Sequence, residues 1–285
     1  MRKQRVISAI VLLIIVAVTV TLGSYFFNAL VLVFATIGML EYNNAMRGKG
    51  YRPMLSVSAL FLVILLLQGI FRTADCFSLN LGRGKLALVN WFSVLTVLAV
   101  MLALTLAVFK NDRYTPADAA ITLFGGFYVA VLASFFMAVR ELGTGLDGLY
   151  CFLLAFLPDI GADSLAYEIG SRFGKHPLIP KVSPKKSVEG SIAAFAASIL
   201  ISLILGLVFT LTGIFTAVPL WIYPVVGLGT GLVSQVGDLA ASIIKRYAGV
   251  KDFGKLIPGH GGVLDRIDSL LFVFPLVYFI LRVVM

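Results

Sequence analysis

The chain has 285 residues, of which 60% are hydrophobic and only 13% are charged, and its formal net charge is +9. A soluble domain usually carries about twice that charged fraction. The composition therefore excludes a soluble globular protein and predicts an all-α fold, a polytopic helical bundle in a membrane. The excess of Lys and Arg is typical of cytoplasmic loops beside anionic lipid headgroups, so we expect no nucleic acid partner.

Apolar runs of about 20 residues, the length that a spanning helix needs, predict nine transmembrane helices. They lie at residues 6–22, 25–41, 53–71, 86–109, 119–139, 148–169, 191–212, 219–243 and 267–284. The basic N-terminal run imitates a secretory signal, but it lacks a cleavage site with small residues. We interpret it as an uncleaved first span.

The basic residues of alternate loops indicate how the chain is oriented. Of the 23 Lys and Arg residues, 18 fall in loops on the side of the N-terminus and five on the other side. The positive-inside rule therefore predicts a cytoplasmic N-terminus and an external C-terminus in the cell (inner) membrane. The loops between spans six and seven and between spans eight and nine are then both cytoplasmic.

The distribution of charge also divides the chain into two parts of one membrane unit. Residues 1–145 have few charges outside loops and are expected to form a transmembrane scaffold, whereas residues 146–285 hold the intramembrane acids and are expected to be the catalytic part. Cys76 lies in a polar loop and Cys151 in an apolar run, so we expect neither a disulfide nor a zinc site.

Acidic residues within or beside the apolar runs are the first candidates for a functional site. They are Asp159, Asp163, Asp238, Asp265 and Asp268. Three isolated acids at bilayer depth would cost of order 8–10 kcal/mol, so Asp159, Asp163 and Asp238 should meet a cation, one another or water. Asp265 and Asp268 begin a helix, and each alone could instead complement the helix dipole.

The directions of the predicted helices place most of these acids at one depth. Asp163, Asp238, Asp265 and Asp268 should converge near the cytoplasmic side, and carboxylate oxygens are ligands that Mg²⁺ prefers. Basic residues border them in the two cytoplasmic loops: Lys175, Lys185, Lys186, Lys245, Arg246, Lys251 and Arg266. Mg²⁺ beside many cations is the chemistry of a polyphosphate site, and the presence of a second cation is left open.

Two short segments add backbone groups to the predicted site. In the run PGHGG, Gly261 and Gly262 let N–H groups approach phosphate oxygens closely. Ser187 is a predicted N-cap, and the helix N-terminus that follows it favours anions. A flexible loop would explain PGHGG alone, and the positive-inside rule would explain the lysines alone. Together these features favour a nucleotide site at the membrane surface.

The segment SIIKRYAGVKDFGKLIPGHGGVLDRID, from Ser242 to Asp268, resembles the signature of phosphatidate cytidylyltransferases, also called CDP-diacylglycerol synthases. The spacing of S-x-x-K-R, K-D, P-G-H-G-G and D-R-x-D carries the resemblance. It is strong over about residues 159–268 and only general over the N-terminal spans. The chain departs from the family at Ala241, where an acid is frequent, and at Ser187, where Thr is frequent.

The resemblance implies a reaction of CTP with phosphatidic acid that gives CDP-diacylglycerol and pyrophosphate, with Mg²⁺, in phospholipid biosynthesis. The implied catalytic residues are Lys245, Arg246, Lys251, Asp252, His260 and Arg266. The implied substrate-binding residues are Asp159, Tyr167, Lys175, Ser183, Lys185, Lys186, Ser242, Gly261 and Gly262. The implied metal ligands are Asp163, Asp238, Asp265 and Asp268.

His260 is expected to donate a hydrogen bond to phosphate, or to order its loop, rather than to act as a general base. A phosphate monoester has a second pKa of about 6, so the attacking lipid phosphate is already largely ionised near pH 7.

Two other functions are weighed against this one. A CTP-dependent kinase of a lipid alcohol would need a base for the hydroxyl. An ion-coupled transporter would hold its acids at the midplane and show internal symmetry, but here the acids lean to one side and no repeat is evident. A homodimer is compatible with the sequence, although no residue proves it.

Overall fold

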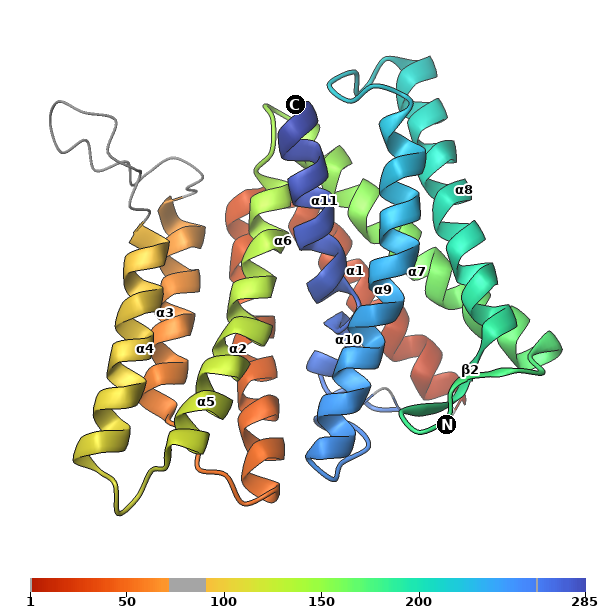
Figure 1. The fold of residues 1–285 in the computed structure, drawn as a ribbon. Coiled ribbons are helices and arrows are strands. Elements are labelled where there is room, and N and C mark those ends of the chain that lie inside the picture. Colours follow the sequence, from red (N-terminus) through yellow and green to blue (C-terminus); the bar gives the residue numbers. More distant parts are fainter. Residues whose placement is uncertain (1, 72–90, 260) are drawn as a thin grey trace, which may run out of the picture. The chain divides into compact units, whose positions relative to one another are not determined.

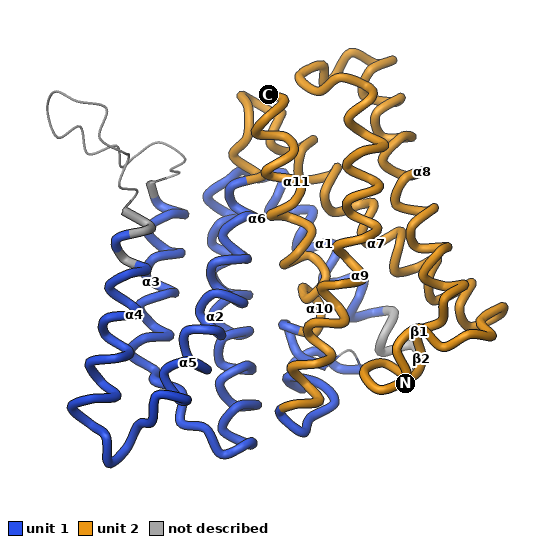
Figure 2. The backbone as a smooth tube through the Cα atoms, in the orientation of Figure 1, with its two compact units in different colours: residues 1–138, 248–264 blue, residues 139–247, 265–285 orange. Residues whose placement is uncertain are grey.

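The structure is a computed structural model that describes residues 2–71, 91–259 and 261–285. Most of these residues are helical, which confirms the predicted all-α class. The helices form two compact units, which we describe one at a time (Figure 2). The first unit consists of Met1–Ala138 and Ala248–Leu264, and the second of Val139–Tyr247 and Asp265–Met285.

The first unit is a set of consecutive helices that pack on their neighbours (Figure 1). They are α1 (Arg2–Leu22), α2 (Ser24–Gly48), α3 (Leu55–Phe71), α4 (Trp91–Phe109), α5 (Pro116–Gly125), the π-helix η1 (Gly126–Val131) and most of α6 (Leu132–Arg140). Helix α2 packs on α1, α3, α5 and η1, and α4 packs on α3 and α5. The segment Ala248–Leu264 completes this unit.

Local sequence signals explain how α5 begins and how α2 is held. The Thr115 side chain accepts a hydrogen bond from the Asp118 N–H at 3.2 Å, and Asp118 Oδ2 accepts one from the Thr115 N–H at 2.8 Å. This reciprocal capping box, with Pro116 in the first turn, fixes the helix start. On α2, the buried Asn43 donates from Nδ2 to Ser58 Oγ of α3 at 3.1 Å, while its Oδ1 has no hydrogen-bond partner within the described residues.

The second unit is a bundle of four long helices with most of a one-turn helix and a small hairpin. Its elements are α7 (Asp147–Phe173), β1 (Pro177–Ile179), β2 (Ser183–Ser187), α8 (Val188–Thr212), α9 (Ile222–Tyr247), α10 (Leu264–Ile267) and α11 (Leu270–Val284). Helix α7 packs along α8, α8 packs along α9, and α11 contacts both α7 and α9. Helix α7 continues through Pro158 without a break.

The hairpin is a structural feature that the sequence did not predict. Strands β1 and β2 are antiparallel, with Pro177 opposite Ser187 and Ile179 opposite Ser183. Ser187 ends β2 and caps α8, because its Oγ accepts from the Gly190 N–H at 3.2 Å. The predicted N-cap is therefore confirmed. The segment that precedes it forms a two-stranded antiparallel hairpin.

Each predicted span coincides with a helix within the described residues, as expected for an integral membrane protein. Five helical segments there are long and apolar enough to cross a membrane: Ser24–Gly48, Pro116–Arg140, Asp147–Phe173, Val188–Thr212 and Leu264–Val284. Shorter apolar helices cover Ile7–Leu22, Leu55–Ile70 and Thr96–Phe109. The number of nine crossings stays a prediction, and the span expected at residues 86–109 begins outside the described part of the chain, as does Cys76.

Candidate functional site

Carboxylates from α7, α9 and the turn between α10 and α11 gather in the second unit. Asp159 and Asp163 lie on α7, Asp238 lies on α9, and Asp268 precedes α11. These four groups are close enough to repel one another electrostatically. Such a concentration of negative charge at helix surfaces in an apolar protein needs cations, protons or water to balance it.

Lys245 supplies one such cation from the last turn of α9. Its Nζ lies 2.8 Å from Asp265 Oδ1 and 3.7 Å from Asp268 Oδ2. The three residues are buried, with 9% of Lys245, 6% of Asp265 and 9% of Asp268 exposed. Because charges removed from water are costly unless they are paired, these three residues depend on one another.

Asp159, the most buried of these acids, accepts a hydrogen bond from the residue that precedes α11. Ser269 Oγ donates to Asp159 Oδ2 at 3.0 Å, and the Ser269 N–H donates to Asp268 Oδ1 at 3.0 Å. Only 2% of Asp159 is exposed, and within the described residues its Oδ1 atom has no hydrogen-bond partner. This unsatisfied oxygen is a candidate ligand for a cation or water.

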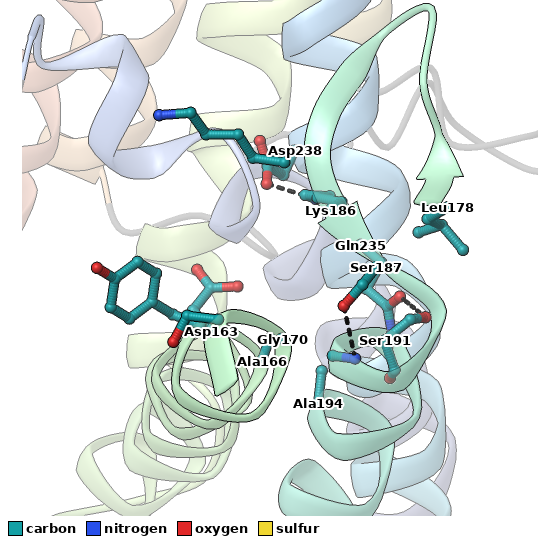
Figure 3. Close-up of a pocket in the computed structure, with 14 residues that line it drawn as sticks. Asp163, Ala166, Gly170, Leu178, Lys186, Ser187, Ser191, Ala194, Gln235 and Asp238 are labelled. Carbon is teal, nitrogen blue, oxygen red and sulfur yellow. Dashed lines mark hydrogen bonds and ion pairs between the residues drawn. The ribbon is translucent and has the colours of Figure 1, made fainter. Parts of the chain in front are cut away.

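A pocket with a volume of about 590 Å³ opens between the hairpin and helices α7, α8 and α9. Asp163, Asp238, Lys185 and Lys186 line it. Figure 3 shows Lys186 reaching from β2 to Asp238 on α9, and the two charged groups are 2.5 Å apart. The pocket therefore carries two of the four acids that the sequence assigned to metal and two of the lysines that it assigned to phosphate.

The opposite part of the pocket lining comes from the N-terminal turns of α8. Ser187, Gly190 and Ser191 lie there, facing Gln235 of α9. Ser191 Oγ donates to Gln235 Oε1, and Gln235 Nε2 donates to the Gly231 carbonyl at 2.8 Å. A helix N-terminus favours anions through its unpaired N–H groups and its dipole.

The sequence reasoning missed Ser191 and Gln235. The only signal was a polar residue inside each of two apolar runs.

A clamp that the sequence did not reveal holds the hairpin to α8. The His176 ring nitrogen Nδ1 lies 2.6 Å from Glu189 Oε1, and Glu189 Oε2 accepts from the backbone N–H groups of Lys175 at 3.1 Å and His176 at 3.3 Å. The acid in the first turn of α8 thus fixes the chain just before β1. Among the described residues, the pocket lining does not include Lys175 or Ser183.

The glycine-rich part of the signature lies in the first unit. Gly259 and Gly261 have φ angles of 79° and 90°, a left-handed conformation that favours glycine. The Ile257 N–H donates to the Gly261 carbonyl at 2.9 Å and closes the turn. Lys251 and Asp252 are exposed in the same segment, while His260 lies outside the described residues.

The remaining predicted residues are placed as follows. Ser242 is buried one turn before Lys245 on α9, while Arg246 and Arg266 are exposed, and Arg266 is close enough to interact electrostatically with Asp163 and Asp268. Tyr167 lines the pocket and is 73% exposed. The structure thus brings most of the predicted charged residues together in the second unit, while Lys251, Asp252, Gly261 and Gly262 belong to the first.

The donor atoms of this cluster fit Mg²⁺ in their chemistry, since all are carboxylate oxygens. Asp159, whose Oδ1 accepts no hydrogen bond from the described residues, adds a further carboxylate oxygen beside these acids. No three His, Cys, Asp or Glu residues in the described ranges already form a preorganised metal cage. Instead, Lys186 and Lys245 balance the charge of Asp238, Asp265 and Asp268.

These features define an integral membrane protein whose second unit holds a pocket and a cluster of paired lysines and carboxylates. The chain belongs to the cytidylyltransferase family, whose sequence profile matches residues 3–284. The phosphatidate cytidylyltransferases of Synechocystis sp. and Staphylococcus haemolyticus are each 31% identical over 98% of this chain, covering 96% and 98% of their own lengths. That of Bacillus subtilis is 30% identical over 98% of this chain and 97% of its own length. The family resemblance predicted from the signature is confirmed.

Proposed function

We propose that this chain transfers the cytidylyl group of CTP to phosphatidic acid, which forms CDP-diacylglycerol and releases pyrophosphate. The observation that carries the proposal is the family match over residues 3–284, with relatives of that activity aligned over 98% of the chain. In the reaction, a phosphate oxygen of the lipid attacks the α-phosphorus of CTP. The bond to the β-phosphate oxygen breaks, and pyrophosphate leaves with its electrons.

The pocket in the second unit is the proposed nucleotide site. Its volume of about 590 Å³ lies within the usual range for small-molecule sites. Lys185 and Lys186 would bind phosphate groups of CTP, and the N-terminus of α8 would add N–H donors. For Lys186 this requires its ammonium group to exchange Asp238 for phosphate or to contact both.

The main chemical difficulty is to bring two anions together, and the cations of this chain serve that purpose. Lys245 and Arg266 are proposed to offset charge on the phosphate groups, and positioning supplies much of the rate. Asp163, Asp238, Asp265 and Asp268 would hold Mg²⁺, which when bound neutralises charge on the phosphates and on the leaving group. A second cation, where the reaction uses one, would bind in the same acidic cluster.

The rest of the signature is proposed to assist without a general base. His260 would donate a hydrogen bond to phosphate or pyrophosphate, since the lipid phosphate is already largely ionised near pH 7. Lys251 and Asp252 are proposed to act from the same segment, with the backbone of Gly261 and Gly262.

The proposed orientation in the membrane has a cytoplasmic N-terminus, an external C-terminus and the site on the cytoplasmic side, where CTP is available. It rests on the distribution of the 23 basic residues. In this arrangement residues 1–145 act as scaffold and residues 146–285 carry the chemistry. The bilayer supplies the lipid substrate, and a homodimer stays a prediction of the sequence alone.

A turnover assay with purified protein in mixed micelles tests the proposed function. CTP, phosphatidic acid and Mg²⁺ should give CDP-diacylglycerol and pyrophosphate in equal amounts, and omission of either substrate should abolish both products. Diacylglycerol in place of phosphatidic acid should give nothing. Formation of CDP and a phosphorylated lipid from diacylglycerol would instead indicate a CTP-dependent lipid kinase.

A further inference from the structure

A buried carboxylate in the N-terminal part of the chain contacts the signature segment within the first unit. Glu41 lies on α2, about two turns before the end of that helix, and only 8% of it is exposed. Its Oε1 accepts a hydrogen bond from the Val263 N–H at 3.0 Å, and its Oε2 accepts one from the Leu264 N–H at 2.9 Å. Glu41 and these two residues are more than 220 positions apart in the sequence.

The two hydrogen bonds have a clear physical role at the start of α10. Val263 and Leu264 precede or begin that short helix, so their N–H groups have no partner within it. A carboxylate that accepts both of them acts as an N-cap supplied by a distant helix. Charge-assisted hydrogen bonds of this kind are roughly twice as strong as neutral ones, so Glu41 defines where the segment ends and α10 begins.

Two glycines of the same segment make room for this carboxylate. A Cβ atom at Gly254 would collide with Glu41 Oε1, and a Cβ atom at Gly262 would collide with both carboxylate oxygens. Neither glycine has a positive φ angle, so backbone conformation does not require glycine there. The absence of a side chain at both positions is explained by the space that Glu41 occupies.

We propose that Glu41 is a positioning residue that holds the backbone at Gly254 and at residues 262–264 in place for catalysis. The segment Ala248–Leu264 carries Lys251, Asp252, Gly261 and Gly262, and Asp265 follows it directly in the chain. The catalytic part of this inference rests on the proposed function, whereas the structural part does not. Glu41 acts on the reaction only through the backbone N–H groups that it binds.

The direct test is amide hydrogen exchange of the purified protein, with Glu41→Gln and Glu41→Ala variants. Glutamine keeps the size but offers one acceptor oxygen and an NH₂ group that faces a donor. Both variants should therefore lose protection from exchange at the Val263 and Leu264 amides.

In the turnover assay, kcat/KM should fall by about 10-fold for Glu41→Gln and by about 100-fold for Glu41→Ala, since small misplacements of a binding segment cost this much. Glu41→Asp keeps the charge and should recover part of the loss relative to Ala.

The matched control is Asn43→Ala, because Asn43 lies on the same helix and is also buried, but bonds to Ser58 of α3. It should lower thermal stability without changing exchange at Val263 and Leu264.

A double-mutant cycle adds a second measurement. Gly254→Ala should impair the wild-type protein but have little further effect in Glu41→Ala, because the smaller residue 41 leaves room for the methyl group.

The inference fails if Glu41→Gln keeps wild-type exchange at Val263 and Leu264, or if Asn43→Ala lowers kcat/KM as much as Glu41→Gln. If Glu41→Ala does not fold, Glu41→Gln and the single variant Gly254→Ala decide the question through exchange alone. A wild-type protein that forms no CDP-diacylglycerol would overturn the proposed function. The exchange experiment needs no substrate and would still test the anchoring by Glu41.

Discussion

At the scale of single residues, Lys245 shows how this protein keeps several acids inside an apolar bundle. One buried ammonium group is paired with Asp265 and lies near Asp268. Removing one partner of a buried pair leaves the other charge uncompensated, which usually costs more than the pair contributed. The same arrangement balances the charge of two acids with one cation inside the second unit.

Asp265→Asn should remove most activity while the protein remains folded. Asparagine keeps the shape and removes the charge, and Asp268 remains as a partner for Lys245. We expect kcat to fall by roughly 100-fold or more, as when a preorganised charged group is removed from an active site. The measurement is turnover in detergent with size-exclusion chromatography as the folding check. Asp112→Asn, an exposed acid before α5, is the control, and wild-type turnover by Asp265→Asn would refute the assignment.

Lys186→Gln should weaken the binding of CTP more than it lowers kcat, the turnover rate of the bound complex. Lys186 is half-buried in the pocket and bonds to Asp238, and hydrogen bonds to charged groups contribute about 1.5–3 kcal/mol. The KM for CTP should therefore rise by about 10-fold or more in initial-rate measurements. Lys110→Gln, at an exposed position just after α4, should have little effect. Equal effects of both substitutions would mean that bulk surface charge, not a site, is responsible.

At the scale of elements, close packing of α8 on α7 positions the hairpin and the pocket. Gly190, in the first turn of α8, is buried, and a Cβ atom there would lie 2.8 Å from the Ala166 carbonyl oxygen of α7. The same turn contains the Ser187 cap and the Glu189 clamp. Separation of the two helices at this point would displace Lys185 and Lys186, since both lie on the strand that leads into α8.

Gly190→Ala should destabilise the protein, because the methyl group would overpack a contact with backbone atoms. Overpacking of this kind costs about 1–3 kcal/mol, which corresponds to several degrees in Tm. Thermal unfolding in detergent measures the shift. Gly48→Ala provides the control, because the Cβ atom at Gly48 would meet nothing within 4 Å. An unchanged Tm in Gly190→Ala would show that α7 and α8 can move apart at this contact without a loss of stability.

The helices were predictable from sequence because a membrane admits few backbone structures, and apolar runs mark where they lie. Their ends were less predictable. Helix α2 continues to Gly48 and α9 to Tyr247, beyond the apolar runs, since hydrogen bonding continues along polar residues. The hairpin was missed because β1 has three residues and β2 contains Pro184, which is tolerated in a strand at a sheet edge.

The composition of the site was predictable in part, but its pairings were not. Charged residues in apolar runs and the signature spacing indicated Asp163, Asp238, Lys186 and Lys245 as candidates. Their partners depend on how helices pack, which residue spacing does not encode. Glu41 gave no local signal at all, because an acid near the end of an apolar run resembles any residue at a membrane boundary.

At the scale of the whole molecule, the distribution of basic residues should fix the orientation of the chain. Topology reporters fused at residues 80, 180 and 285 should read outside, inside and outside. Residue 180 lies between β1 and β2, whereas residue 80 lies outside the described part of the chain. The expectation follows from the positive-inside rule. An inside reading at residue 285 would exclude the arrangement with nine spans.

The hydrogen bonds between α2 and residues 263 and 264 have a consequence for how the protein is made. The two partners are separated by more than 220 residues, and ribosomes add about 5–20 residues per second. For roughly 10–40 s, a nascent chain therefore holds Glu41 before Val263 and Leu264 have been synthesised. These hydrogen bonds can form only when translation is almost complete, so a chain that stalls before residue 263 has helices α1 to α9 but lacks the contact that holds the end of the segment Ala248–Leu264.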